Sequence, residues 1–340
     1  MDYKELLAQA RTNMAPKCRV CPECSGLACR GEIPGVGGYG SGRGFTVCVE
    51  YLRRVKIEMD TLYEEAEPDL AVRLLGQELS LPLMISPIGG MAFNYNGYLT
   101  DLQYNRAVLD GAVRQGILAF SGDTPDPAYF DSLLPLVRES GGRLISTVKP
   151  WPDDLVLDKA AGLKEAGAAY FAMDIDSAGL PALRRSGRGG HPKSPAQLSA
   201  LIRESGLGLI VKGVMTARGA EKARDAGAEA IIVSSHGGRH YEDAPATASV
   251  LPEIRRAVGL DFPVFVDGGI RTGADIFKVL ALGANAAMIG RPYAIAVHGS
   301  TEEGVDIYTQ KLREELRYTM ILAGCRNIAE IGPDRIRLTV

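Results

Sequence analysis

The residues best suited to chemistry are a histidine and several arginines that follow three apolar runs in the second half of the chain. Residues 233–239 read Val-Ser-Ser-His-Gly-Gly-Arg, residues 264–271 read Val-Phe-Val-Asp-Gly-Gly-Ile-Arg, and residues 289–292 read Ile-Gly-Arg-Pro. Each apolar run is typical of a buried strand. At consecutive strand ends of a barrel, these residues would place a base, a carboxylate ligand and a phosphate site together.

The residue types match those three tasks. His236 is the candidate base, because histidine is the side chain whose ordinary pKa lies nearest to neutral pH. Arg239 is the candidate carboxylate ligand, since a guanidinium binds a carboxylate with two parallel hydrogen bonds. The two Gly-Arg elements, 267–271 and 290–291, are typical of a phosphate site made from backbone N–H groups and arginine. The alternative is that these glycines only form tight turns and the arginines surface ion pairs.

The positioning elements are predicted from hydrophobic periodicity. Eight short apolar runs read as strands, most of them apolar on both faces as in parallel sheets, and they cover residues 81–87, 117–121, 143–149, 170–176, 207–214, 230–235, 263–268 and 286–290. Helical patterns lie between them, for example over residues 101–115, 153–165, 217–226, 248–258 and 273–282. The pattern predicts an α/β fold, a TIM (β/α)8 barrel over residues 69–340, preceded by an N-terminal helical and Cys- and Gly-rich extension over residues 1–68.

In such a barrel, chemistry lies at the carboxyl ends of the strands. The predicted strands end in polar or reactive residues, namely Ser86, Ser121, Lys149, Asp174 with Asp176, Lys212, His236, Asp267 and Arg291.

Composition excludes some classes of function. The chain has 340 residues, 46% of them hydrophobic, and a net charge of -3 with both signs interspersed, so nucleic acid is not an expected partner. No stretch of about 18 apolar residues occurs, and the N-terminus has no signal-peptide pattern, so we expect a cytoplasmic protein without a membrane partner.

The motifs at residues 212–214, 232–239, 251–254, 267–273 and 289–292 resemble those of the FMN-dependent 2-hydroxy-acid oxidases and dehydrogenases, the family of glycolate oxidase, lactate oxidase and mandelate dehydrogenase. The similarity covers about residues 69–291. It implies FMN as cofactor and oxidation of a small L-2-hydroxy acid to the 2-keto acid.

The resemblance also implies roles for individual residues. His236 would be the base, Asp174 the carboxylate behind it, Arg239 the ligand of the substrate carboxylate, and Lys212 the cation at the flavin N1/O2 edge. The implied FMN contacts are Pro87, Ile88, Gly89, Ser121, Lys212, Ser234, Asp267, Gly269, Arg271, Gly290 and Arg291. Asp176 is an alternative to Asp174, because both lie on the same face of a strand. His240 is the alternative base.

Some positions depart from the family pattern. A tyrosine expected after the third strand is missing at 145–150, and Tyr39 is the candidate for a second one. In the loop after the fourth strand, Arg184, Arg185 or Arg188 are candidates for a further carboxylate ligand.

Four cysteines in the extension, Cys18, Cys21, Cys24 and Cys29, have the spacing Cys-x2-Cys-x2-Cys-x4-Cys. Thiols stay reduced in the cytoplasm, so a metal site is a better interpretation than disulfides. The spacing is similar to that of bacterial ferredoxins, and both an iron–sulfur cluster and zinc fit it. Redox-regulatory or structural thiols are the alternative. Residues 31–44 contain seven glycines and are either a lid over the active-site mouth or a linker.

Two further functions stay open. One is an FMN barrel with other chemistry, such as a type 2 isopentenyl-diphosphate isomerase-like enzyme, although a diphosphate substrate does not call for the His-Gly-Gly-Arg motif. The other is a flavin- or thiol-based redox sensor that uses the Cys-rich segment. The expected partners are a small 2-hydroxy acid, a protein electron acceptor if a cluster is present, and further copies of the chain in a homo-oligomer, which is commonly a tetramer in this family.

Overall fold

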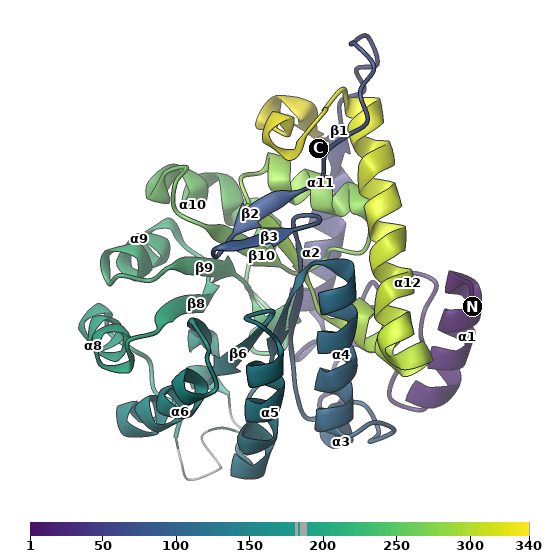
Figure 1. Ribbon diagram of the computed structural model, residues 1–340. Coiled ribbons are helices and arrows are strands. Elements are labelled where there is room, and N and C mark those ends of the chain that lie inside the picture. The colour runs from purple at the N-terminus through teal and green to yellow at the C-terminus, as the bar shows by residue number, and fades with distance from the viewer. Residues whose placement is uncertain (181–182, 184–188, 340) are drawn as a thin grey trace.

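The centre of the fold is a closed barrel of eight parallel strands (Figure 1). In the computed structural model, which describes residues 1–180, 183 and 189–339, consecutive strands pair along the chain and the last pairs with the first. The strands are β4 (Leu83–Ile88), β5 (Leu118–Ser121), β6 (Leu144–Val148), β7 (Tyr170–Asp174), β8 (Gly208–Val214), β9 (Ala230–Val233), β10 (Val264–Asp267) and β11 (Ala286–Ile289). The predicted strands and the TIM-barrel fold are confirmed.

Both faces of these strands are buried, which explains their continuous apolar sequences. The side chains that fill the barrel interior form a cluster of their own, which includes Met84, Leu118, Phe120, Ile145, Ala172, Ile210, Ala230, Ile232, Phe265, Ala286 and Met288. Residues next to them along each strand, such as Ile85 and Val266, belong to the larger cluster that includes residues of the surrounding helices. The interior is therefore a packed core, and its open end is left for chemistry.

Helices follow the strands and cover the outside of the barrel (Figure 1), and they are α4 (Asp101–Gln115), α5 (Pro127–Glu139), α6 (Asp153–Glu165), α8 (Pro195–Ser205), α9 (Ala217–Asp225), α10 (Leu251–Val258), α11 (Gly273–Ala281) and α12 (Arg291–Ala323). Their ends follow local signals. For example, Thr100 caps α4, and Gly116 ends it with a left-handed φ of 67°. In α12 two helical pieces join at Ser300 and Thr301, whose backbone angles are not helical.

A hairpin that the sequence analysis did not predict closes the amino end of the barrel. Strands β2 (Val72–Leu74) and β3 (Gln77–Leu79) pair antiparallel, and Leu79 packs into the barrel interior. Figure 1 shows this hairpin in front of the strands. The amino end is thus covered, which leaves the carboxyl end for ligands.

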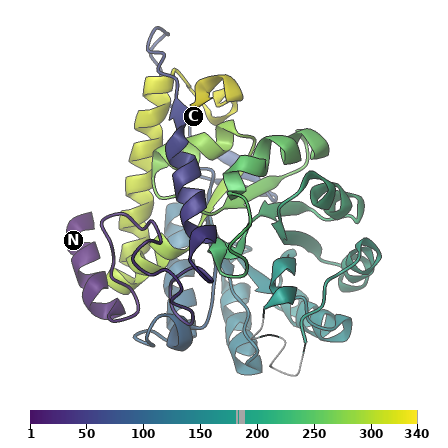
Figure 2. The same cartoon turned by 180° about the vertical axis from the view of Figure 1, so that it is seen from behind.

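The N-terminal extension packs against the barrel at several points. Helix α1 (Tyr3–Met14) lies along α12, with the rings of Tyr3 and Tyr308 stacked 5.9 Å apart. Helix α2 (Arg43–Arg54) leads into β1 (Val55–Ile57), which pairs antiparallel with β12 (Ile336–Leu338) at the other end of the chain. Figure 2 shows the extension in front of the barrel, on the side opposite to the β2–β3 hairpin. The boundary between residues 68 and 69 stays a prediction, since β12 of the predicted barrel domain pairs with β1 of the extension.

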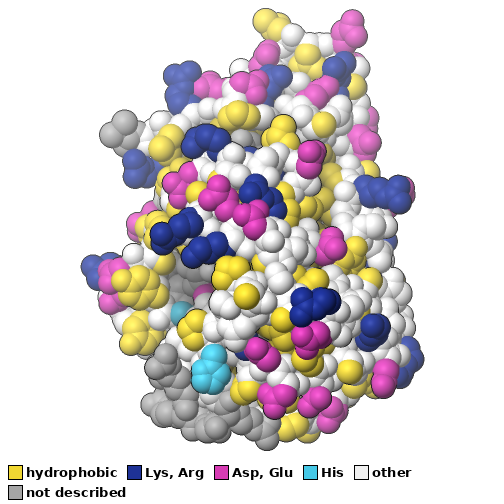
Figure 3. Space-filling view, turned by 90° about the vertical axis from the view of Figure 1, so that its left-hand side faces the viewer, with side chains coloured by type: hydrophobic (Ala, Val, Ile, Leu, Met, Phe, Trp, Pro, Cys, Tyr) yellow, Lys and Arg dark blue, Asp and Glu magenta, His cyan; other side chains and the backbone are white. Residues whose placement is uncertain are grey.

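The surface charge and the hydrophobicity of the helices can be compared with the expectations from composition. On the face seen in Figure 3, basic and acidic side chains are interspersed. Within the described residues, no helix is both long enough and apolar enough to cross a membrane.

Two helix glycines give a matched test of the packing. A methyl group at Gly111 in α4 would overlap the Val305 side chain of α12, whereas at Gly162 in α6 the nearest atom, Leu134 Cδ1, is 3.5 Å away. We expect Gly111→Ala to lower the free energy of unfolding by about 1–2 kcal/mol, because overpacking outweighs the gain in helix propensity. Gly162→Ala should raise it by up to about 1 kcal/mol. Urea unfolding of both variants checks this, and a stabilised Gly111→Ala variant would contradict the packing of α4 on α12.

Candidate active site

The predicted base lies in a strained turn at the carboxyl end of β9. After Val233 the chain forms a short 3-10 turn, His236–Gly238, in which all three residues have left-handed φ values of 55°, 63° and 71°. Such a φ is uncommon for histidine, and strain of this kind is concentrated at functional sites. The turn is fixed by the hydrogen bond from the His236 N–H to Ser234 Oγ (3.0 Å) and by the close approach of α2 to Gly238.

Two carboxylates at the end of β7 lie beside His236. Its Nδ1 is 3.3 Å from Asp176 Oδ1 and 3.8 Å from Asp174 Oδ2. Asp174 is instead hydrogen-bonded to the ammonium of Lys149, at 3.1 Å. Both candidate carboxylates therefore lie beside His236. Asp176, the alternative, is the nearer of the two, and the role of Asp174 stays a prediction. The strand ends at Asp174, and the following 3-10 helix η1 (Ile175–Gly179) turns Asp176 towards the histidine.

Burial and neighbouring cations keep the histidine neutral. Burial is the main reason why the pKa of His236 lies well below its usual value, and the charges of Lys212 and Lys149 lower it further. The ring of His240 stacks on it at 3.7 Å, and burial lowers the pKa of His240 to about 2. A neutral imidazole whose Nδ1 faces a carboxylate leaves Nε2 free to accept a proton. Asp176, His236 and His240 also lie close enough together, within 4.8 Å, to hold a metal ion.

Lys212 belongs to a buried polar network that spans three strand ends. Its ammonium donates to Ser234 Oγ at 2.8 Å, and the Ser234 hydroxyl donates to Asp267 Oδ2 at 2.9 Å. Burial alone would lower the pKa of Lys212, but the carboxylates of Asp267, Asp176 and Asp174 outweigh it and raise the pKa. The network keeps the Lys212 ammonium in its charged form, next to the Asp267 carboxylate, at the floor of the open end of the barrel.

Three arginines gather at the same end without an acidic partner. Arg239 donates to the backbone oxygens of Gly35 (2.6 Å) and Gly37 (3.2 Å), and Arg291 to those of Val36 (2.7 Å) and Gly237 (2.9 Å). Arg271 donates to backbone oxygens too. Throughout the described part of the chain, no carboxylate lies at ion-pair distance from any of the three. Burial lowers the pKa of Arg239 to about 10. Buried guanidinium groups that have only neutral acceptors favour an anion.

Two residues of the predicted phosphate site, Gly290 and Arg291, lie at the amino end of α12. Gly290 directly precedes the first turn of α12, so the amino end of a long helix and Arg291 face the same place. Gly269 has another explanation, because a Cβ there would come within 2.5 Å of the Cys48 oxygen in α2. Close packing against α2 therefore explains the glycine at position 269. The contact of Gly269 with FMN stays a prediction.

Buried polar atoms without a hydrogen-bond partner test whether the site fits FMN. Among the described residues, several of these atoms lie at or just beyond the carboxyl ends of the barrel strands, namely Ser86 Oγ, Thr147 Oγ1, Asp174 Oδ1, Asp176 Oδ2, Ser235 Oγ, His240 Nδ1 and Asp267 Oδ1. Unpaired buried polar atoms are costly unless a ligand or water satisfies them. Together with the arginines they suit a ligand that carries a phosphate and a polar ring edge, as FMN does.

Other predicted contacts lie where expected, at the ends of β4 and β5. Pro87 and Ile88 end β4, Gly89 follows it, and Ser121 ends β5, where its hydroxyl lies 3.2 Å from Ser146 Oγ. Tyr39 is 47% exposed, and its predicted role in binding substrate stays a prediction. The candidates Arg184, Arg185 and Arg188 lie outside the described residues.

Comparison with known proteins agrees with this geometry. The sequence profile of the FMN-dependent dehydrogenase family matches residues 36–177 and 183–338. Glycolate oxidase 5 of Oryza sativa subsp. japonica is 30% identical over 315 residues, which are 84% of this chain and 85% of that enzyme. The chain belongs to the FMN-dependent dehydrogenase family. The cofactor of the family is FMN.

Other relatives match over a shorter stretch. Glycolate oxidase 3 of Oryza sativa subsp. indica is 50% identical to this chain over a stretch that covers 38% of this chain and 35% of that enzyme. L-lactate oxidase of Roseobacter sp. (strain GAI101) is 44% identical over a stretch that covers 40% of this chain and 37% of that enzyme. In both alignments the chain spans little more than a third of the relative's length. A solved structure of a mandelate oxidase variant superposes with a TM-score of 0.79 at 26% identity, covering 99% of this chain and 98% of that one.

In this member of the FMN-dependent dehydrogenase family, the roles of the two aspartates can be separated. We expect Asp176→Asn to slow flavin reduction by a hydroxy acid by about 10²-fold or more, because the imidazolium that forms on His236 loses its nearest carboxylate. Asp174→Asn keeps that carboxylate and should have a smaller effect. Stopped-flow reduction of both variants at saturating substrate measures the difference, and a larger loss in Asp174→Asn would reverse the assignment.

Lys149 occupies the region where the family tyrosine was expected, and it sets the charge around His236. Its positive charge, after burial and Lys212, lowers the pKa of His236. Removing the charge in Lys149→Met therefore raises that pKa, so the acidic limb of kcat/KM against pH should move to higher pH. Lys222→Met, on the surface of α9, is the control and should leave the limb in place. An unmoved limb in Lys149→Met would contradict the electrostatic role.

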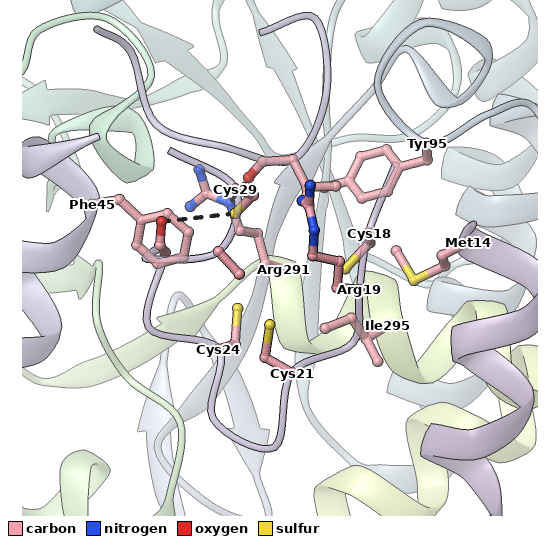
Figure 4. Close-up of a pocket in the computed structure, with 13 residues that line it drawn as sticks. Met14, Cys18, Arg19, Cys21, Cys24, Cys29, Phe45, Tyr95, Arg291 and Ile295 are labelled. Atoms are coloured by element: carbon pink, nitrogen blue, oxygen red, sulfur yellow. Dashed lines mark hydrogen bonds between the residues drawn. The ribbon is translucent and has the colours of Figure 1, made fainter. Parts of the chain in front are cut away.

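The four predicted metal ligands lie together in one loop. Cys18, Cys21, Cys24 and Cys29 are all free thiols that line one pocket, which lies next to Arg291 (Figure 4). Burial raises the pKa of Cys18 to about 11, so without a metal this thiol is protonated at neutral pH.

Sequence reasoning missed Asn94 and Phe45. Asn94 Oδ1 accepts a hydrogen bond from Arg239 (2.9 Å), and the ring of Phe45 lies 4.0 Å from the guanidinium carbon of Arg291. Neither position carries a local signal, because both contacts join segments far apart in the sequence.

Proposed function

We propose that this chain oxidises a small L-2-hydroxy acid to the 2-keto acid with bound FMN. The proposal rests on two groups that lie at the same strand end. His236 is neutral and pairs with Asp176, and the half-buried Arg239 has no carboxylate partner among the described residues. A proton acceptor and an anion ligand at one strand end are what a hydroxy acid requires.

FMN, when bound, supplies the acceptor for the two electrons that leave the substrate. Arg271, Arg291 and the amino end of α12 would hold its phosphate, and Lys212 would oppose negative charge at the ring. Arg239 orients the substrate carboxylate. His236 accepts a proton from the substrate at Nε2, and Asp176 stabilises the resulting imidazolium through Nδ1.

The glycine-rich segment 31–44 would then act as a cover of the mouth. Its backbone already holds Arg239 and Arg291, and the Tyr39 N–H donates to the Gly238 oxygen at 2.8 Å. A substrate carboxylate offers Arg239 an opposite charge and two parallel hydrogen bonds, which the neutral carbonyl oxygens of Gly35 and Gly37 do not. Substrate is thus expected to displace the carbonyls of Gly35 and Gly37 from Arg239, which supports the lid interpretation over a linker.

The test follows the visible spectrum of anaerobically purified protein during addition of L-lactate, glycolate and L-mandelate. We expect one of them to bleach the oxidised-flavin bands, with and without EDTA, since the proposal uses no metal at Asp176, His236 and His240. A flavin that none of them reduces would overturn the proposal and favour isomerase-like chemistry or a sensor. Protein that contains no flavin as purified, and that takes up none during incubation with FMN, would also overturn the proposal.

The identity of the electron acceptor, a closed homo-oligomer such as a tetramer, and a cytoplasmic location stay predictions. Light scattering coupled to gel filtration measures the oligomer. Reoxidation rates of the reduced protein with oxygen and with one-electron carriers distinguish an oxidase from a dehydrogenase.

A further inference from the structure

The Cys-rich loop between α1 and α2 is built around a cavity that hydroxy-acid oxidation does not use. All four cysteines of residues 18–29 line this cavity, which is partly open to solvent. In Figure 4 the sulfurs of Cys21 and Cys24 point into it from below, and those of Cys18 and Cys29 lie on its upper side. Its other walls are largely apolar, with Met14, Val36, Phe45, Tyr95 and Ile295 among them.

The loop is held in place by contacts outside the thiols. Arg11 at the end of α1 donates to the Val20 oxygen at 2.8 Å, Arg53 of α2 forms an ion pair with Glu23, and Arg271 donates to the Cys24 oxygen at 2.9 Å. Val20 is completely buried. Three separate elements thus fix the backbone on both sides of the cysteines.

The four sulfurs are not drawn together as closely as the thiolates of a bound zinc ion. No three of the four cysteine sulfurs lie within 4.8 Å of one another, since among the described residues only Asp176, His236 and His240 form such a group. A tetrahedral zinc ion with bonds of about 2.3 Å would bring its thiolates to roughly 3.8 Å. In a four-iron cluster each thiolate binds a different iron, so the sulfurs stand further apart.

We propose that Cys18, Cys21, Cys24 and Cys29 bind a [4Fe–4S] cluster in this cavity. Three cysteines at two-residue gaps on one loop are the ligand spacing of such clusters. The apolar walls would shield the cluster from water. The proposal does not rest on the proposed hydroxy-acid oxidation.

The cavity lies next to residues that are proposed to hold the FMN phosphate. Arg291 and Phe45 both line the cavity, and the Phe45 ring contacts the guanidinium groups of Arg291 and Arg271, which are proposed to bind the FMN phosphate. A cluster here would lie next to the phosphate end of the flavin site.

The test is the iron and acid-labile sulfide content of the full-length protein purified without oxygen. We expect about four irons and four sulfides per chain, and an electron paramagnetic resonance signal after reduction with dithionite. Cys21→Ser and Cys24→Ser should each lose most of the iron while they keep the far-UV circular dichroism of the parent. Cys325→Ala removes a buried cysteine far along the chain from the loop and should keep all of the iron.

Three outcomes would overturn the proposal. One is about one zinc per chain without sulfide. Another is protein that contains no iron as purified and takes up none after incubation with ferrous iron and sulfide. The third is iron that persists in Cys21→Ser and Cys24→Ser. If the variants do not fold, the metal and sulfide content of the parent protein still decides between the cluster, zinc and neither, whatever the flavin does with hydroxy acids.

Discussion

We expect His236→Asn to slow reduction of the bound flavin by the hydroxy acid by about 10²- to 10⁴-fold, the range for loss of a general base. The replacement tests chemistry rather than backbone strain, because asparagine accepts the left-handed φ of 55° that this turn requires. It also keeps a side chain of similar polarity beside Asp176. Stopped-flow absorbance under anaerobic conditions measures the rate.

The flavin content should not change, since no contact to the phosphate site is removed. His191→Asn is the matched control: this histidine is exposed, and we expect a rate within two-fold of the parent. A rate in His236→Asn within about five-fold of the parent would remove His236 as the base and make the stacked His240 the next candidate.

Arg239→Lys should lower kcat/KM by about 10²-fold, equal to about 2.7 kcal/mol, mainly through a higher KM. A lysine keeps the positive charge but cannot form the two parallel hydrogen bonds that a guanidinium makes with a carboxylate. It would also lose at least one of the three contacts that Arg239 makes with Gly35, Gly37 and Asn94. Steady-state kinetics over a range of hydroxy-acid concentrations measures the effect.

The control for this change is Arg43→Lys. Arg43 lies on the surface near the same mouth, and its ion pairs within the described residues are with Glu242 and Asp243. We expect the kinetic constants of Arg43→Lys to stay within two-fold of the parent. A KM of Arg239→Lys that also stays within two-fold would mean that another cation binds the substrate carboxylate, and Lys149 would then be tested.

The barrel could be predicted because its strands are buried on both sides. Such strands appear in the sequence as apolar runs that end in polar residues, and the spacing of the runs indicates the fold. The pairs β2–β3 and β1–β12 could not be predicted in this way. Each strand has three residues and a half-exposed pattern, too short for periodicity, and β1 pairs with a strand at the opposite end of the chain.

For the candidate site, the residue types and their positions at strand ends were enough to predict that His236, Lys212, Arg239 and Arg291 lie at the same end of the barrel. They did not decide between Asp174 and Asp176, because the choice depends on where β7 ends and η1 begins. The contacts of Arg239 with Gly35 and Asn94 span 204 and 145 residues, and no local pattern records them. The sequence motifs gave no role to Lys149, which directly follows β6, because its contact with Asp174 joins two different strands.

The extension is fastened at both of its ends to the last third of the chain. Helix α1 lies on α12, and the strand after α2 pairs with β12, so the segment between them forms a closed loop rather than a free arm. A loop with fixed ends loses far less conformational freedom when it binds a ligand than a tail that is attached at one end. The pairing of β12 with β1 therefore helps to hold in place a segment that lies almost the whole length of the chain away from it in the sequence.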